Sequence, residues 1–293
     1  MLSRVLDIVA AEGWFDTAAP FEKTIQLTHG AAHCATLSRG GRADTFVKFS
    51  ELASLAAEAQ RCLRAGRDFA GIAPAFVGHA ARASLEVLAT KAESFDAVTA
   101  ISFERAGDRA RLLTGLECYF ARMRQAVAPA APVASPRVPR AWFDDMTAYF
   151  AAARSTPSTL SALDLARDAL PGLPPMPQHG DLVANNLGLR PDGTLVVFDW
   201  EDYGAVDLPG LDLFTLDMSL GTQAGAGGSG LPPPAVERCC AALGLVPHAY
   251  RRLAPAYALA FRYLKRNYSP EVRARVDALL ERVSGAPEGR AAR

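Results

Sequence analysis

The sequence predicts an α+β fold in two parts, a small antiparallel sheet near the N-terminus followed by a mainly helical region. Two observations carry this prediction. Short β-rich runs separated by glycines and polar turns extend as far as Ala89, and such runs are typical of strands. Beyond Phe103, apolar residues recur at helical spacing instead. We therefore expect a first lobe at residues 1–103 and a second lobe at residues 104–293.

The first region alternates helix and strand patterns along the chain. An amphipathic helix is predicted at Leu2–Ala11, and the strand-rich stretch Thr24–Phe49 follows it. The last strand of that stretch leads directly into a predicted helix, Glu51–Ala65, which contains no glycine or proline. Two further strands are expected at Pro74–Gly78 and Ser84–Ala89. These elements together predict a small sheet with helical cover.

Helical patterns dominate the second region, and prolines separate them. The patterns lie at Trp142–Ala153, at Thr159–Ala169 and from Pro234 onward. Proline cannot continue a helix, so the proline cluster after Ala169 marks an interruption. In Ala128–Pro139, alanine and proline crowd together without an apolar period. That segment is expected to be a surface loop or a linker between lobes.

Charge and cysteine content exclude several classes of protein. The chain has 31 basic and 31 acidic residues, and a formal net charge of zero gives no reason to expect a nucleic-acid partner. The five cysteines show no C-x-x-C spacing, and Met1–Glu12 does not form a signal peptide. No apolar run approaches the roughly 20 residues that a membrane-spanning helix needs. We expect a cytoplasmic monomer or dimer without membrane contact.

One segment of the second region carries the residues best suited to chemistry. His179, Asp181 and Asn186 fit the pattern H-x-D-x-x-x-x-N, and Asp199 follows Asn186 by 13 residues. A predicted hairpin around the turn Pro191–Gly193 brings Asp199 back beside Asn186. A carboxylate and an amide oxygen suit Mg²⁺, and Asp181 is then left to act as a general base. The pattern predicts phosphoryl transfer.

A second pair of residues lies upstream. Lys48 is in the strand that precedes the predicted helix, and Glu58 lies ten residues later within that helix. This order suits a lysine that contacts phosphates and is held there by a helix carboxylate. An isolated helix glutamate is usually a solvated charge. The prediction therefore depends on the order of Lys48, Glu58, the His179–Asn186 loop and Asp199 taken together.

On these residues the chain resembles the aminoglycoside phosphotransferase and choline kinase superfamily, whose fold is similar to that of protein kinases. The resemblance is most specific from Gln178 to Leu213, where His179-Gly180-Asp181 and Phe198-Asp199-Trp200-Glu201 match sequence motifs of that family. It implies a two-lobe protein kinase-like fold with a small antiparallel-sheet N-lobe and a mainly helical C-lobe. It also implies a small-molecule kinase that uses ATP or GTP together with Mg²⁺.

The same resemblance implies a role for each candidate residue. The catalytic base is Asp181, the magnesium ligands are Asn186 and Asp199, the phosphate contact is Lys48, and the ion-pair partner of that lysine is Glu58. His179 is expected to brace the catalytic loop, and Asp212 to anchor the helix that follows. Thr28–Ala35 falls where the loop over the nucleotide phosphates belongs, and with one glycine it departs from the protein-kinase form.

Other interpretations of the same residues stay open. A catalytically silent nucleotide-binding regulatory module would bind nucleotide without turnover. A protein kinase needs a long activation segment after Asp199, yet only a short segment separates it from Asp212. Aspartate and asparagine also favour turns and strand ends in any protein, so Asp181 and Asn186 could have a purely structural role.

Charge gives a hint about the acceptor. From Leu231 to Arg293 there are eleven basic and five acidic residues. A solvated helix face is the simpler interpretation of this surplus. The resemblance by itself leads us to expect a sugar, aminoglycoside-like or amino-alcohol acceptor. If the cations line a cleft, a neutral or anionic acceptor such as a sugar or a sugar acid is favoured over an aminoglycoside. Tyr257, Phe261 and Tyr263 could stack on it, although such a stripe is more typical of a core.

Overall fold

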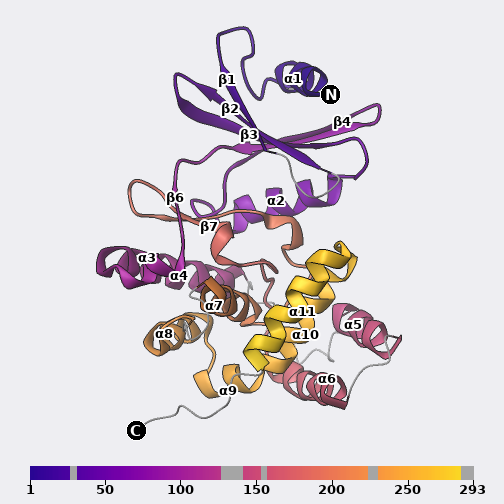
Figure 1. The fold of residues 1–293 in the computed structure, drawn as a ribbon, viewed down its shortest axis with the longest axis vertical. Helices are drawn as coiled ribbons and strands as arrows, with labels where there is room; N and C mark the ends of the chain where they lie inside the picture. The colour runs from indigo at the N-terminus through magenta and orange to yellow at the C-terminus, as the bar shows by residue number, and fades with distance from the viewer. Residues whose placement is uncertain (27–31, 127–140, 153–156, 224–229, 285–293) are drawn as a thin grey trace. The chain divides into compact units, whose positions relative to one another are not determined.

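The structure is a computed structural model that describes residues 1–26, 32–126, 141–152, 157–223 and 230–284 (Figure 1). Its contacts divide the chain into two compact units. The N-terminal unit consists of Met1–Ala97 and Leu187–Glu201, and the C-terminal unit consists of Val98–Asn186 and Asp202–Arg293. The loop or linker expected at Ala128–Pro139, and part of the loop expected at Thr28–Ala35, lie outside the described residues.

Antiparallel strands form the main sheet of the N-terminal unit in the order β1-β2-β3-β5-β4. The strands are β1 (Glu22–Gln26), β2 (His33–Arg39), β3 (Arg42–Ser50), β4 (Phe76–Arg82) and β5 (Leu85–Lys91). Gly40 and Gly41 connect β2 to β3 with φ of 56° and 73°. Glycine adopts positive φ at little cost, so this pair sets the two-residue turn and the register of the hairpin.

Side chains alternate between the two faces of this sheet. On one face, Val47 and Val87 share an apolar core with residues of α1 (Leu2–Ala11). On the other face, Leu88 packs in a smaller cluster with residues at the start of α2 (Ala56–Asp68). Figure 1 shows α1 and α2 on opposite sides of the strands. The two faces of the sheet therefore carry different helices.

Helix α2 begins later than the predicted helix Glu51–Ala65. The Ser50 hydroxyl accepts a hydrogen bond of 3.1 Å from the Leu52 backbone N–H. The Glu86 carboxylate accepts another, of 2.7 Å, from the Leu55 backbone N–H. Side chains thus satisfy the backbone groups that an earlier helix start would have used. Leu52, which falls inside the predicted helix, lies before α2 instead and is 87% exposed.

A second, smaller sheet completes the N-terminal unit. It joins β6 (Asp96–Ala97), β7 (Leu187–Leu189) and β8 (Leu195–Val197) in that order, and all neighbours are antiparallel. The predicted hairpin is present as β7 and β8. The Arg190 guanidinium anchors it by two bonds, of 2.8 and 3.0 Å, to the Glu93 carboxylate.

Helices build the C-terminal unit, together with short 3₁₀ turns. They are α3 (Ala100–Glu104), α4 (Ala106–Ala126), α5 (Ala141–Ala152), α6 (Pro157–Ala169), α7 (Leu211–Gln223), α8 (Pro233–Leu243), α9 (Pro247–Arg252), α10 (Ala254–Leu264) and α11 (Pro270–Ser284). Helix α4 packs with α8, and α10 packs with α6 and α7. The predicted α+β class, with a small sheet first and a mainly helical region after it, is confirmed.

Within the described residues, no helix combines the length and the apolar character that crossing a bilayer would require.

Candidate active site

The N-terminal unit holds a cluster of charged residues around Lys48. Its neighbours in β3 face the α1 core, so the alternation of the strand turns Lys48 toward the α2 side of the sheet. There its Nζ lies 2.9 Å from Glu58 Oε2 and 3.1 Å from Glu201 Oε2. Glu58 comes from the first turn of α2. Residues far apart in the sequence therefore share one partly buried ion-pair network.

Burial and charge act in opposite directions on this network. Burial by itself lowers the pKa of Lys48, but the carboxylates of Glu201, Glu58 and Asp199 outweigh it and raise that pKa above its usual value. Burial raises the pKa of Glu58, and the nearby Lys48 opposes this rise. Lys48 is therefore held as a cation.

Asp199 lies next to the Lys48 network in an unusual backbone conformation. Its φ is +60°, in the left-handed region that non-glycine residues seldom occupy. The residues on either side of Asp199 are held in place. The Trp200 indole N–H donates to the Val197 carbonyl at 2.8 Å, and the Phe198 ring packs on the Phe95 ring with centroids 4.4 Å apart. The strained conformation is thus fixed by the residues that flank it.

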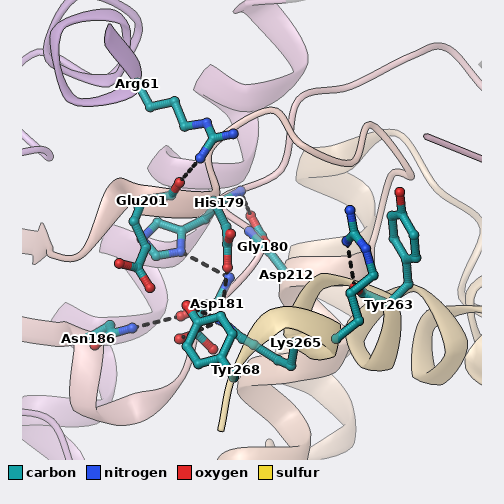
Figure 2. A network of polar contacts seen from close by, with 12 residues as sticks. Arg61, His179, Gly180, Asp181, Asn186, Glu201, Asp212, Tyr263, Lys265 and Tyr268 are labelled. Carbon is teal, nitrogen blue, oxygen red and sulfur yellow. Dashed lines mark hydrogen bonds and ion pairs between the residues drawn. The ribbon is translucent and has the colours of Figure 1, made fainter. Parts of the chain in front are cut away.

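Carboxylate oxygens of Glu58, Asp199 and Glu201 lie within 4.8 Å of one another. Hard divalent cations such as Mg²⁺ prefer oxygen ligands of this kind. Of the predicted metal ligands, Asp199 belongs to this set and its carboxylate suits Mg²⁺, whereas Glu58 and Glu201 both pair with Lys48. The Arg61 guanidinium also donates to the Glu201 backbone carbonyl, as Figure 2 shows. This bond ties α2 to the segment that carries Asp199 and Glu201.

The C-terminal unit holds the loop of residues 179–186. A buried carboxylate shapes this loop. Asp212 accepts hydrogen bonds from the backbone N–H groups of His179 at 2.8 Å and Gly180 at 2.9 Å, and from the Tyr119 hydroxyl at 2.8 Å. Burial raises the pKa of Asp212, and these bonds oppose the rise. Asp212 thus anchors the loop as well as the start of α7.

Gly180 and Asn186 complete the shape of the loop. Gly180 has φ +87°, and a Cβ built on it would lie 2.9 Å from the Asp202 Cβ, so a larger residue would be strained there. The His179 Nδ1 accepts a bond of 3.2 Å from the Asp181 backbone N–H. The Asn186 amide donates to the Asp181 carbonyl oxygen at 2.9 Å. These contacts fix the backbone on both sides of the Asp181 side chain.

A buried lysine contacts the Asp181 carboxylate. Lys265 lies in the 3₁₀ turn after α10, and its Nζ is 3.2 Å from Asp181 Oδ2 and 2.9 Å from Asp202 Oδ2. The Tyr268 hydroxyl is 3.3 Å from the same nitrogen. Figure 2 shows Lys265 and Tyr268 beside Asp181. Burial by itself lowers the pKa of Lys265, but Asp181 and Asp202 raise it above its usual value.

The structure distributes the predicted site residues over the two units. Lys48, Glu58 and Asp199 gather in the N-terminal unit, while Asp181 and Asn186 share the loop of the C-terminal unit. The convergence expected between Asn186 and Asp199 stays a prediction. Sequence reasoning assigned no role to several contacting residues, namely Glu201, Arg61, Asp202 and Lys265. Glu201 is the last residue of the motif Phe198-Asp199-Trp200-Glu201, and its position two residues after Asp199 was the signal that could have identified it.

Comparison with known proteins decides the family. The sequence matches the phosphotransferase enzyme family over residues 23–256. The chain belongs to that family. The resemblance drawn from the His179–Asn186 loop and from Asp199 is therefore confirmed, and the chain is a phosphotransferase. No curated protein sequence matches this one significantly.

Solved structures of phosphotransferases share the fold. A choline/ethanolamine kinase family protein from Mesorhizobium loti has 17% identity and a TM-score of 0.59, with 97% of this chain and 93% of that one covered. An ethanolamine kinase from Plasmodium vivax has 11% identity and a TM-score of 0.61, covering 98% and 90%. A thermostable mutant of aminoglycoside phosphotransferase APH(4)-Ia, in a ternary complex with ADP and hygromycin B, has 16% identity and a TM-score of 0.56, covering 97% and 99%.

Proposed function

We propose that this phosphotransferase moves the γ-phosphoryl group of ATP or GTP onto a hydroxyl of a small acceptor in a Mg²⁺-dependent reaction. The observation that carries the proposal is the gathering of Lys48, Glu58 and Asp199 in one partly buried cluster. Such a cluster supplies a fixed cation for phosphate oxygens and a carboxylate for a metal. The nucleotide bound by the similar phosphotransferase structure supports the same co-substrate.

Each of the five candidate site residues has a defined role in this proposal. Asp181 accepts the proton of the acceptor hydroxyl while the new oxygen–phosphorus bond forms and the nucleoside diphosphate leaves. Lys48 contacts the phosphates, and Glu58 holds its side chain in place. Asn186 and Asp199 would hold Mg²⁺, which neutralises charge on the phosphates when bound. Since the Asn186 amide nitrogen binds a carbonyl oxygen, its own oxygen is the atom suited to the metal.

The acceptor preference follows from where the basic residues lie. Arg251 and Arg252 are exposed, and Arg262 pairs with Asp277 at 2.8 Å. Most of the C-terminal positive charge is therefore a solvated face. Lys265, by contrast, lies directly against Asp181. Asp181 and Asp202 balance the charge of Lys265, so this contact adds no surplus of positive charge, and a neutral acceptor such as a sugar is the one we propose.

The aromatic stripe on α10 does not contribute to an acceptor site in this proposal. Tyr257, Phe261 and Tyr263 are 0%, 3% and 5% exposed. The Tyr257 hydroxyl donates to the Pro209 carbonyl at 2.9 Å. These side chains are core residues, as such a stripe usually is.

Acceptor-stimulated release of ADP or GDP tests the proposal. The purified chain is assayed with and without Mg²⁺ against hygromycin B, choline, ethanolamine, glucose and gluconate. Asp181→Asn is the test variant, and Asp277→Asn, an isosteric change at an exposed ion pair, is its matched control. We expect turnover to require Mg²⁺, to survive in the control and to fall by at least about 10²-fold in Asp181→Asn. Nucleotide binding without turnover for any acceptor would favour the regulatory module instead.

A further inference from the structure

Lys265 is a buried cation that belongs to the C-terminal surplus of basic residues, for which the sequence left open a solvated helix face and a cleft lining. Its side chain is 4% exposed. A buried ammonium is costly unless it is paired and hydrogen-bonded. In this case Asp181, Asp202 and Tyr268 all contact its Nζ, so the charge is compensated on several sides. Such a lysine is held in one place by its surroundings.

The fold brings Lys265 to Asp181 from a distant part of the chain. Helix α10 ends at Leu264, and the 3₁₀ turn Lys265–Asn267 follows it. The last residues of α10 are buried, since Phe261 and Leu264 are 3% and 6% exposed, and the Phe261 ring centroid lies 5.9 Å from the Lys265 Nζ. The Tyr268 ring also lies beside the ammonium, with 4.5 Å from Nζ to the ring centroid. The lysine stem is therefore packed as well as paired.

We propose that Lys265 is a positioning residue for the catalytic base. Its ammonium holds Oδ2 of Asp181, which fixes the rotation of the carboxylate, and Asp202 holds the ammonium in turn. This inference rests on the proposed function, because it requires Asp181 to be the base. A base that is held in one orientation loses less freedom when the acceptor hydroxyl arrives. Lys265 therefore acts on the rate of transfer through Asp181.

A purely structural ion pair is the competing explanation, and the two explanations differ in one measurable way. A positioning lysine matters only while the base is present. A structural lysine matters equally with or without the Asp181 carboxylate. The discriminating quantity is therefore the coupling between the two residues, obtained from a double-mutant cycle.

The experiment measures ADP release from MgATP with the panel acceptor that gives the highest rate. The chains are wild type, Lys265→Met, Lys265→Arg, Asp181→Asn and the double variant Lys265→Met/Asp181→Asn. Arg262→Met is the matched control, since that cation lies one turn earlier and pairs with Asp277. The affinity for ADP is measured for every variant by calorimetry, so that a loss of folded protein is separated from a loss of rate.

We expect Lys265→Met to lower kcat by about 10- to 100-fold, the range typical when a group that orients a functional side chain is lost. The KM for ATP and the affinity for ADP should stay within about twofold, and Lys265→Arg should recover part of kcat because its charge is retained. In the Asp181→Asn background, Lys265→Met should change the residual rate by less than about threefold. Arg262→Met should behave as wild type.

Several results would overturn the inference. Equal kcat in wild type and Lys265→Met would exclude a positioning role, and an equal loss in both backgrounds would assign Lys265 to stability alone. If Lys265→Met does not fold, the double variant Lys265→Met/Asp202→Asn takes its place, because it also removes the charge of the Asp202 carboxylate that would be buried without its partner. A wild-type kcat in that double variant would also overturn the inference. A wild-type chain that turns over no panel acceptor would instead reject the proposed function, and the inference with it.

Discussion

Replacing Asp212 by alanine removes the acceptor of three buried hydrogen bonds and tests how the loop of residues 179–186 is held. Two of these bonds come from the backbone of the loop, at His179 and Gly180, and one comes from the Tyr119 hydroxyl. A hydrogen bond to a charged group contributes about 1.5–3 kcal/mol. The three bonds together therefore contribute at least about 4.5 kcal/mol.

Burial of the carboxylate offsets part of that contribution, because burial raises the pKa of Asp212 and so disfavours the charged form. We therefore expect Asp212→Ala to lower the free energy of unfolding by about 3 kcal/mol. Guanidinium denaturation followed by circular dichroism measures this change. Tyr119→Phe, which removes a single bond, should cost about half as much or less. A loss below about 1 kcal/mol for Asp212→Ala would refute the reasoning, because the loop would then be held by other contacts.

Two further predictions concern Gly180 in the loop of residues 179–186 and Cys62 in helix α2. Gly180→Ala should lower kcat and reduce the free energy of unfolding by about 1–2 kcal/mol, because a Cβ is disfavoured at positive φ and would lie 2.9 Å from the Asp202 Cβ. Activity and thermal unfolding of the variant check this, and a wild-type kcat would contradict it. Burial raises the pKa of the Cys62 thiol to about 12, so its thiolate is scarce at neutral pH. Alkylation of Cys62 by iodoacetamide should rise about tenfold per pH unit up to pH 10, whereas an ordinary thiol levels off near pH 9; mass spectrometry of the labelled peptide distinguishes the two.

Local pattern was sufficient for the fold class and for locating the motif at residues 179–186 that carries the family resemblance. The hairpin turn at Gly40 and Gly41, helix α1 and the hairpin after Asn186 all follow from short-range rules. The start of helix α2 does not follow from these rules. The Ser50 and Glu86 side chains accept hydrogen bonds from backbone N–H groups just before Ala56, and this prevents an earlier helix start. Competition of that kind involves a residue from another strand and leaves no periodic signal.

The residues of the candidate site likewise fall into those that the sequence pattern predicted and those that it missed. Motif order predicted Lys48, Glu58, Asp181, Asn186 and Asp199 as candidates, but it gave no indication that Lys265 is buried. A lysine at the end of a helix is usually solvated, and its burial depends on two aspartates from distant segments. The sequence pattern alone therefore does not predict which distant residues pair with a charged side chain such as Lys265.

The assignment of Leu187–Glu201 to the N-terminal unit has a consequence for synthesis on the ribosome. Strand β6 pairs with β7, and Lys48 meets Glu201 across 153 positions of sequence. Domains commonly fold as they emerge, N-terminal part first. In this chain the N-terminal unit is still missing a strand pair and a carboxylate after residue 97 has emerged, and it becomes complete only when residue 201 is available. A nascent chain stalled between these points should therefore expose an unfinished N-terminal unit to chaperones and proteases.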